Sequence, residues 1–331
     1  MAKLKVCLVC QKYQLAREYL SIHNALEQQF ELVRHFVDEK WPSSIQDIPN
    51  YSSYEAVIWY VRFRDIITKP PFDWKNYDGV RLMFEQDACQ NYSLVAGDQF
   101  FGAWPKVFRD HRFDVIACTG KATQDNLRDS GVNAIWIPKG FDHTRFCDLK
   151  MMRSGIGYFG ELYRARGQML IHVKRHKIPV TKFKCTFFEL NEYLNRFEII
   201  LICNMVGTLK KGASKLINRM LPSYGMEISA GPEPMQKNFE VAASGCVQFC
   251  DEIPELHDLG FIDGETMVSY RTFDELVQKL EVYRQAPDRL EYIAKQATEL
   301  SNAKHTWNHR ARLFDEAIRN PQSWQNSGRK M

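Results

Sequence analysis

Short, continuous runs of hydrophobic residues alternate with amphipathic stretches along this chain, and this alternation constrains its fold more than any other feature. Runs such as 5–10 (KVCLVC), 55–61 (EAVIWYV) and 198–203 (EIILIC) lack the regular polar positions of a strand with one solvated face. Continuous runs are typical of strands in a parallel sheet that helices cover on both faces. The sequence therefore predicts an α/β protein of repeated strand–helix units.

The predicted elements fall into two series, which suits the length of 331 residues. The first series adds strands at 31–37, 79–85, 113–119 and 133–138, and helices at 14–28 and 121–129. Thr119 is expected to cap the second of these helices and Gly131 to close it. The second series has strands at 156–160, 180–187, 226–230, 246–250 and 267–270, and helices at 162–175, 235–244, 272–285, 288–300 and 305–319.

Two doubly wound, Rossmann-like parallel-sheet domains facing each other across a cleft are the fold that this order predicts. We expect an amino-terminal domain over 1–145 and a second domain over 155–305. A carboxy-terminal helix and a frayed tail follow over 305–331.

Composition excludes several classes of protein. The formal net charge of +4 is too small for a dedicated nucleic-acid binder. No run of about 18 apolar residues is present, and the start, MAKLKVCLVCQ, lacks a secretory signal. We therefore expect a cytoplasmic protein with at most peripheral membrane contact.

The nine cysteines lie mostly in apolar runs, and Cys7 and Cys10 are expected to point to opposite faces of a strand. We therefore expect buried, reduced thiols and no metal site.

Charge is distributed unevenly along the chain. Residues 151–220 hold 13 basic and 4 acidic residues, whereas 1–150 are balanced and 221–331 carry more acids than bases. Either this basic block is a solvated, lysine-rich face, or it lines a cleft that receives an anion such as the diphosphate of a nucleotide.

Two common nucleotide-binding classes are excluded by the missing glycines. The turn after the first strand reads VCQKYQLA, whereas a dinucleotide-binding turn needs glycines for the pyrophosphate to approach the backbone. No G-x-x-x-x-G-K-[ST] sequence occurs, so the chain is no P-loop NTPase.

The stretch 233–270 contains the pattern most informative for function. A helix is expected to begin near Met235 after Pro232 and Pro234, with its unsatisfied amides and positive dipole available to a phosphate. Lys237 adds a positive charge, and Glu240 is placed to accept two hydrogen bonds from a ribose diol.

A series of short motifs runs through this part of the chain. They are Lys237-Asn238-Phe239-Glu240, Ala243-Ser244-Gly245, Pro254-Glu255-Leu256, Asp263-Gly264-Glu265, Phe273-Asp274-Glu275-Leu276 and His305-Thr306-Trp307 with Arg310. In this order and spacing they resemble the carboxy-terminal domain of GT-B glycosyltransferases, and among these the spore-maturation-like "glycosyl transferases group 1" proteins. Pro138-x-Gly140-Phe141-Asp142 resembles the hinge of that fold, and Gly157-x-x-Gly160 with Arg166 resembles the turn that opens its second domain.

The resemblance implies that 1–145 is the acceptor-side domain and 155–305 the nucleotide-sugar donor domain. It also implies a role for several residues. Glu240 would bind the ribose hydroxyls of the donor, and Lys237 with the amides around Met235 and Gln236 would hold its diphosphate. Related retaining enzymes place an acid eight residues before this glutamate. Here position 232 is proline and the nearest acid is Glu233, so the contact to the donor sugar and the stereochemical class stay open.

Departure of the nucleotide needs positive charge near the β-phosphate. No D-x-D metal motif occurs, so metal-independent catalysis is expected. The candidate cations are Arg166, Lys210, Lys211 and Lys215. Gly160 belongs to the same predicted binding site. The alternative for the lysine pair, with nearby Lys215, is an exposed loop of solvated side chains.

An inverting enzyme also needs a base for the acceptor hydroxyl. Asp87 and Glu85 lie where the strand 79–85 ends, and Asp87 is preferred because it lies beyond the strand. A loop-capping acid is the alternative. Weaker candidates for the base are His111 and His23. Arg62 and Arg64 are candidates for an anionic acceptor group, or else for ion pairs with Asp65 or Glu85.

These observations together predict a metal-independent glycosyltransferase that moves a sugar from a nucleotide-diphosphate donor to a hydroxyl acceptor. The acceptor would be a glycan, a lipid-linked intermediate or a small metabolite, and no cofactor is expected besides the donor. A sugar-nucleotide epimerase of the same fold and a non-catalytic nucleotide-sugar-binding protein are the alternatives.

Overall fold

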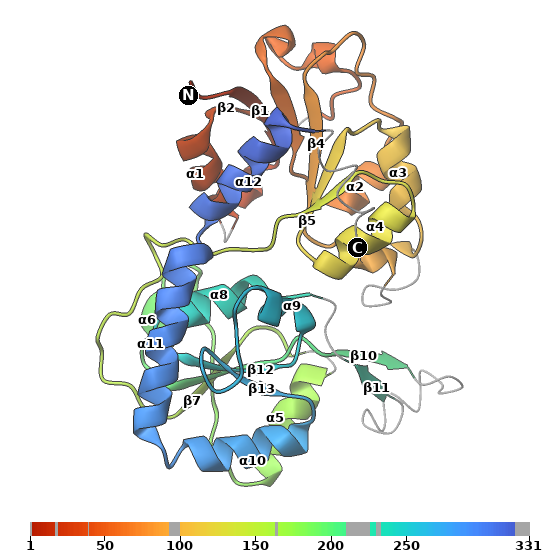
Figure 1. Cartoon of the computed structure of the whole chain (residues 1–331). Helices are drawn as coiled ribbons and strands as arrows, with labels where there is room; N and C mark the ends of the chain where they lie inside the picture. Colours follow the sequence, from red (N-terminus) through yellow and green to blue (C-terminus); the bar gives the residue numbers. More distant parts are fainter. Residues whose placement is uncertain are drawn as a thin grey trace. The chain divides into compact units, whose positions relative to one another are not determined.

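The computed structural model describes residues 2–16, 19–38, 40–92, 100–162, 165–209, 226–229 and 233–321. The chain forms two compact units (Figure 1). Unit 1 consists of Met1–Pro138 and Trp307–Met331, and unit 2 of Lys139–Thr306. The division therefore differs from the expected 1–145, 155–305 and 305–331, because the last helix belongs to unit 1 and not to a separate segment.

Unit 1 is built on a six-stranded parallel sheet in the order β2-β1-β3-β4-β5-β6. Its strands lie where the hydrophobic runs predict them. They are β1 (Lys5–Cys10), β2 (Glu31–Phe36), β3 (Ala56–Trp59), β4 (Val80–Glu85), β5 (Val115–Cys118) and β6 (Ala134–Trp136). All four residues of β3 and of β5 are buried, as continuous hydrophobic runs imply for strands covered on both faces.

The helices of unit 1 depart from the sequence prediction in two places. They are α1 (Leu20–Gln29), α2 (Phe63–Ile67), α3 (Trp104–Asp110), α4 (Lys121–Asp129) and α12 (Trp307–Arg319). The expected helix over 14–28 is divided, because Lys12–Ala16 form a 3-10 turn and α1 begins only at Leu20. The expected cap at Thr119 is wrong, since Gly120 occupies the N-cap position and the Thr119 hydroxyl donates to the carbonyl of Gln86.

The two faces of the unit 1 sheet are packed separately. Cys7 belongs to the core on one face, with Trp59 and Trp104, whereas Cys10 belongs to the core on the other. The second core also takes in Trp307 and Phe314 of α12, so the end of the chain completes it. Burial raises the pKa of both thiols to about 12 and keeps them neutral. The expectation of buried thiols is confirmed for this pair.

Unit 2 repeats the same strand order on a smaller scale. Its parallel sheet runs β13-β12-β9-β7-β8, so the first strand lies between the second and the third, as in unit 1. The strands are β7 (Ile156–Phe159), β8 (Thr181–Phe183), β9 (Ile199–Ile202), β12 (Val247–Asp251) and β13 (Val268–Tyr270). The helices are α5 (Ala165–Arg175), α6 (Leu190–Leu194), α8 (Gln236–Ala243), α9 (Pro254–Asp258), α10 (Phe273–Tyr283) and α11 (Pro287–Lys304).

One strand of unit 2 lies apart from the main sheet. The run expected at 226–230 is a strand, β11 (Met226–Ser229), but it pairs antiparallel with β10 (Val206–Leu209). The two form a separate two-stranded sheet beside α5 in Figure 1.

The two ends of unit 2 meet. Phe141 forms an isolated parallel bridge with Thr306, and its amide donates to the carbonyl of His305 at 3.1 Å. The chain thus enters unit 2 and leaves it at neighbouring points.

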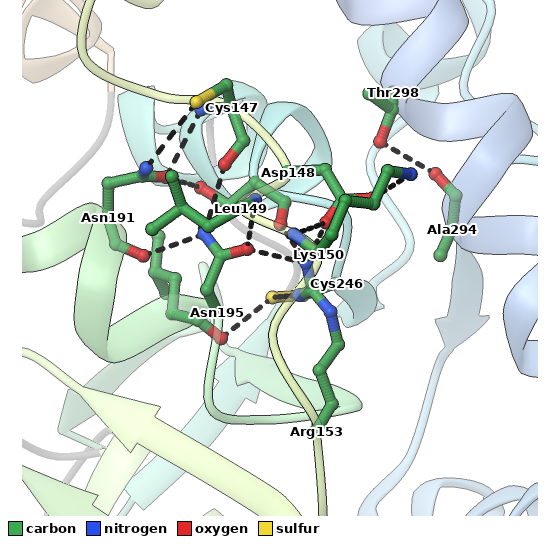
Figure 2. A network of polar contacts seen from close by, with 12 residues as sticks. Cys147, Asp148, Leu149, Lys150, Arg153, Asn191, Asn195, Cys246, Ala294 and Thr298 are labelled. Carbon is green, nitrogen blue, oxygen red and sulfur yellow. Dashed lines mark hydrogen bonds and ion pairs between the residues drawn. The ribbon is translucent and has the colours of Figure 1, made fainter.

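A partly buried arginine holds the segment that leads into β7 (Figure 2). Arg153 Nη2 donates to Asp148 Oδ1 at 2.7 Å, to Asn195 Oδ1 at 2.6 Å and to the carbonyl of Ser244 at 2.8 Å. Its Nη1 lies 3.1 Å from the Cys246 sulfur. These contacts are at the amino-terminal edge of the sheet, beside a groove of about 680 Å³ whose other wall is α11. They fix the loop by which the chain enters the sheet.

Candidate functional site

The carboxyl ends of β7 and β9 bring together most of the residues that the sequence singled out. In unit 2 these two strands are neighbours although β8 separates them along the chain, so the connections that follow them leave toward opposite sides. The edge of a parallel sheet at such a switch point is where doubly wound folds bind ligands. Gly160 follows β7 directly, and Cys203 follows β9.

Helix α8 supplies three of the predicted residues, and its local sequence explains where it begins. Met235 is the N-cap, with extended backbone at φ −88° and ψ 156°, and its amide donates to Asn238 Oδ1 at 2.9 Å. Gly245, at φ +74°, follows the last turn in the left-handed region that glycine readily adopts. The helix predicted over 235–244 is thus confirmed and spans Gln236–Ala243.

Lys237 extends from α8 to the end of β7. Its Nζ donates to the carbonyl of Phe159 at 3.2 Å and lies 4.5 Å from the centre of the Phe159 ring. Gly160 makes room for this approach: its φ is +105°, and a Cβ there would lie 2.9 Å from the Lys237 Nζ. The left-handed backbone at this position favours glycine, and the absent side chain leaves room for the lysine amine.

Arg166 connects the end of β9 with the start of α8. Its Nε donates to the carbonyl of Cys203 at 3.0 Å, and its Nη2 lies 2.9 Å from the Met235 sulfur. The side chain belongs to α5 and is buried, with 9% of its surface exposed. Two cations from two different helices thus converge on one edge of the sheet.

Glu240 is the acid of this site. It is buried, with 4% of its surface exposed, and its Oε1 accepts a hydrogen bond of 2.7 Å from Gln236 Nε2, one turn earlier in α8. A buried carboxylate that keeps its charge needs such donors. The amide of Gln236 orients it.

Burial strongly affects the protonation of Lys237. It lowers the pKa of the amine to about 7, with the positive charge of Arg166 as the second cause, while Glu240 acts in the opposite direction. An anion bound beside the amine would raise this pKa again, because its negative charge favours the protonated form.

Glu233 has a specific partner that the sequence analysis missed. Its Oε1 lies 2.8 Å from the Nζ of Lys139, and both side chains are largely buried, at 6% and 12% exposure. Lys139 lies inside the Pro138-x-Gly140 motif. The position of Lys139 in this motif could have marked it as a candidate site residue. Nothing in the sequence indicated that it pairs with Glu233.

Two predicted cations cannot be placed. Lys210 and Lys211, together with Lys215, lie outside the described residues.

The two predicted acids of unit 1 lie at the carboxyl end of β4. Glu85 is the last residue of the strand and is buried, whereas Asp87 is exposed just beyond it. Glu85 Oε1 accepts a hydrogen bond of 2.9 Å from the Asp87 amide. Asp87 is the N-cap of the 3-10 turn Ala88–Asn91, but its side chain makes no capping hydrogen bond. Glu85 therefore shapes the loop that presents Asp87.

The other candidate site residues of unit 1 whose side chains are described pack against neighbouring residues of the same unit. His111 Nδ1 faces the Phe72 amide at 3.3 Å, and the His111 carbonyl accepts from Trp74 Nε1 at 2.6 Å, so the histidine belongs to the core. His23 is fully buried in α1, with its ring centre 5.7 Å from that of Tyr60. Arg62 lies over the Tyr13 ring at 5.3 Å. The side chain of Arg64 is outside the described part of the chain.

Two searches of the described residues give negative results. Among them, no group of three or more His, Cys, Asp and Glu side chains is placed to hold a metal ion. In the same part of the chain, no helix combines the length and the apolar character needed to cross a bilayer.

Comparison with protein families gives one match. Residues 188–316, which cover most of unit 2 and α12, match the family described as "Glycosyl transferase-like". No curated protein sequence matches the chain.

Many solved structures resemble the chain in fold. Anabaena Alr3699/HepE, solved in complex with UDP-glucose, superposes with a TM-score of 0.63 at 9% identity, over 96% of this chain and 100% of that one. A sucrose-phosphate synthase from Thermosynechococcus elongatus gives 0.60 at 12% identity, over 96% and 99%. A putative UDP-N-acetylglucosamine 2-epimerase from Listeria monocytogenes gives 0.53 at 9% identity, over 96% of both chains.

These comparisons confirm the resemblance noted in the sequence. The chain has the GT-B fold, with two parallel-sheet α/β units, and its second unit contains a glycosyl transferase-like region.

Proposed function

We propose that this protein is a glycosyltransferase that moves a sugar from a nucleoside-diphosphate donor to a hydroxyl acceptor. One observation carries the proposal: Arg166 and Lys237, from two helices, converge on the carboxyl ends of β9 and β7, where their hydrogen bonds end on the carbonyls of Cys203 and Phe159. Two cations at the switch point of a parallel sheet suit a diphosphate.

The chemistry follows from where charge develops in the reaction. When the glycosidic bond to the nucleotide breaks, negative charge appears on the β-phosphate oxygens. Arg166 and Lys237 are fixed before the reaction and would stabilise this charge without reorganising. The amides at the start of α8, around Met235 and Gln236, would add the positive end of the helix dipole.

Glu240 would anchor the nucleoside. Gln236 orients its carboxylate, and the two oxygens of a carboxylate together can accept about four hydrogen bonds, so this group suits the two hydroxyls of a ribose. Glu233 would lie near the donor sugar, as the acid nearest to the position that related retaining enzymes use. In the described structure it is paired with Lys139.

Asp87 is the proposed base. It is exposed at the carboxyl end of β4, and the hydrogen bond from its amide to Glu85 fixes the turn that carries it. A carboxylate in this position would accept the proton of the acceptor hydroxyl as the bond to the sugar forms.

The proposal includes catalysis without a metal ion. Arg166 and Lys237, with Lys210 and Lys211 as further candidates, would take the part that a divalent cation plays in metal-dependent transferases. The reaction would then need only the donor and the acceptor, and no cofactor. UDP is the first nucleotide to test, because Alr3699/HepE was solved with UDP-glucose.

The experiment is incubation with a panel of nucleotide sugars, followed by separation of the products. Release of the nucleoside diphosphate, with the sugar on water or on an added acceptor, would support the transferase. Appearance of an epimeric nucleotide sugar would identify the epimerase instead. Binding without any product would identify a binding protein. If no nucleotide sugar binds, the proposal is wrong.

A further inference from the structure

Lys237 is a partly buried amine that has no ion-pair partner among the described residues. Its Nζ donates to a single carbonyl, that of Phe159, and no ion pair links it to any carboxylate of the described residues. The remaining contacts of the amine are the rings of Phe159 at 4.5 Å and Tyr158 at 6.0 Å. Removing an ammonium group from water costs several kcal/mol unless other charges compensate.

The charged and titratable groups around the amine come from four elements. Arg166 of α5 opposes a second positive charge, and Glu240 of α8 favours it. Cys203, after β9, and Cys250, on β12, would also raise the pKa of the amine if they carried a negative charge. Burial raises the pKa of Cys203 to about 12 and that of Cys250 well above its ordinary value, so both thiols are neutral. Among the described groups that act on the amine, one carboxylate, Glu240, therefore stands against the charges of Arg166 and of Lys237 itself.

We propose that Lys237 binds the donor diphosphate as a proton-coupled residue: its amine is neutral in the empty site at mildly alkaline pH and takes up one proton from solvent when the diphosphate enters. This inference rests on the proposed function of the site. The step is a simple protonation, in which the amine lone pair accepts H⁺ and no other bond changes.

The protonation state of the empty site supports this proposal. Burial, and after it the charge of Arg166, lowers the pKa of Lys237 to about 7, against an ordinary value of 10.5. Two bound phosphate groups would raise it again, because they supply the negative charge that the empty site lacks.

The sign of the pH dependence follows by linkage. Between pH 7 and the higher pKa of the complex, the bound form holds one proton more than the free form, so affinity falls by up to about tenfold for each unit of rising pH. Below pH 7 the amine is already charged and Lys237 contributes no uptake. A terminal phosphate completes its second ionisation near pH 6, so at pH 8 the ligand itself exchanges almost no protons.

Calorimetry measures the effect directly. UDP, GDP, ADP and dTDP are titrated into the full chain at pH 8.0, in buffers with different heats of ionisation. The slope of the observed enthalpy against the buffer's ionisation enthalpy gives the protons taken up. We expect a value close to one for the nucleotide that binds best, and an affinity that falls as the pH is raised from 7 to 9.

Two variants serve as matched controls. Lys237→Arg keeps a positive charge that does not titrate, so the uptake at pH 8 and the pH dependence between 7 and 9 should both disappear. Because the larger group has to fit beside Gly160 and Phe159, Lys237→Met serves as a second variant. It should bind at least tenfold more weakly at pH 7, also without uptake, and the melting temperature of each variant shows whether it is folded.

The possible results separate the two proposals. If a nucleoside diphosphate binds to the wild-type chain without proton uptake, or if Lys237→Arg takes up the same number of protons, the inference is wrong and the donor site stands. If none of the four nucleotides binds, the proposed function is wrong and this inference is wrong with it.

Discussion

Lys139 and Glu233 form a buried ion pair, with Lys139 Nζ 2.8 Å from Glu233 Oε1, although 94 residues separate them in the sequence. Lys139 is the first residue of unit 2, and Glu233 lies just before α8. The pair therefore joins the entry of unit 2 to the loop that precedes the proposed diphosphate site.

Replacing only one residue of this pair should destabilise the chain more than replacing both. Glu233→Gln leaves a largely buried ammonium group without its carboxylate, and such changes cost roughly 3–5 kcal/mol. The double variant Lys139→Met, Glu233→Met removes both charges and should recover most of the loss. Urea unfolding of the three proteins measures the difference. Equal stability of Glu233→Gln and wild type would contradict a structural role for the pair.

Glu240 should matter for nucleotide affinity. Loss of a charge-assisted pair of hydrogen bonds costs roughly 2–4 kcal/mol, so Glu240→Gln or Glu240→Ala should weaken binding of the nucleoside diphosphate by about 30- to 1,000-fold. The melting temperature without ligand should change little. Titration calorimetry checks the affinity, with Glu291→Gln, an exposed acid on α11, as the matched control. An unchanged affinity, or a collapse in stability, would remove Glu240 from the site.

Asp87 should matter for transfer and not for donor binding. Asp87→Asn keeps the size of the side chain but cannot accept a proton, and loss of a general base typically lowers the rate by about 10²- to 10⁴-fold. Nucleotide affinity should stay within about twofold of wild type. Parallel measurement of sugar transfer and of nucleotide binding tests both statements. A variant that transfers at the wild-type rate would exclude Asp87 as the base.

Catalysis should be independent of divalent metal ions. Because side-chain cations are proposed to stabilise the departing diphosphate, activity in excess EDTA should equal that of the untreated protein. The assay compares initial rates with EDTA and with added Mg²⁺ or Mn²⁺. Loss of activity in EDTA that Mn²⁺ restores would contradict this part of the proposal.

His23 should make the chain sensitive to acid. Burial is the main cause that lowers the pKa of this histidine to about 4, below its ordinary 6.5. The unfolded chain binds the proton below pH 6.5, whereas the folded chain does so only near pH 4, so stability falls as the pH falls through this window. The loss attributable to His23 is about 3 kcal/mol.

A variant isolates this contribution. In His23→Phe, urea unfolding at pH 7 and at pH 4.5 should show a smaller difference in stability than in wild type. His35 and His111 are affected in the same direction and remain in both proteins. An identical pH dependence would mean that His23 is not the responsible group.

The sequence was most informative where a property is local. Runs such as 198–203 identify buried strands because burial on both faces requires continuous apolar residues, and β9 lies there. The helix after Pro234 was predictable for the same reason, since its start and its end depend on neighbouring residues. Five-residue helices such as α2 and α9 were not predicted, because they are too short to show the 3.6-residue period of hydrophobic positions.

Features that depend on distant residues could not be read from the sequence. The ion pair of Lys139 with Glu233 needs the folded chain. So do the surroundings of the Lys237 amine, because its carbonyl partner, Phe159, is 78 residues away. The sequence placed a lysine in the first turn of the helix, but only the structure shows that its amine lies against Phe159.

The meeting of Phe141 with Thr306 makes unit 2 a domain insertion within unit 1. Its two ends are neighbours, so residues 139–306 can be excised as one continuous piece. The remainder can be closed by a short linker between Pro138 and Trp307. A truncation that simply stops at residue 306 would instead strip Trp307 and Phe314 from the core of unit 1 and leave that unit incomplete.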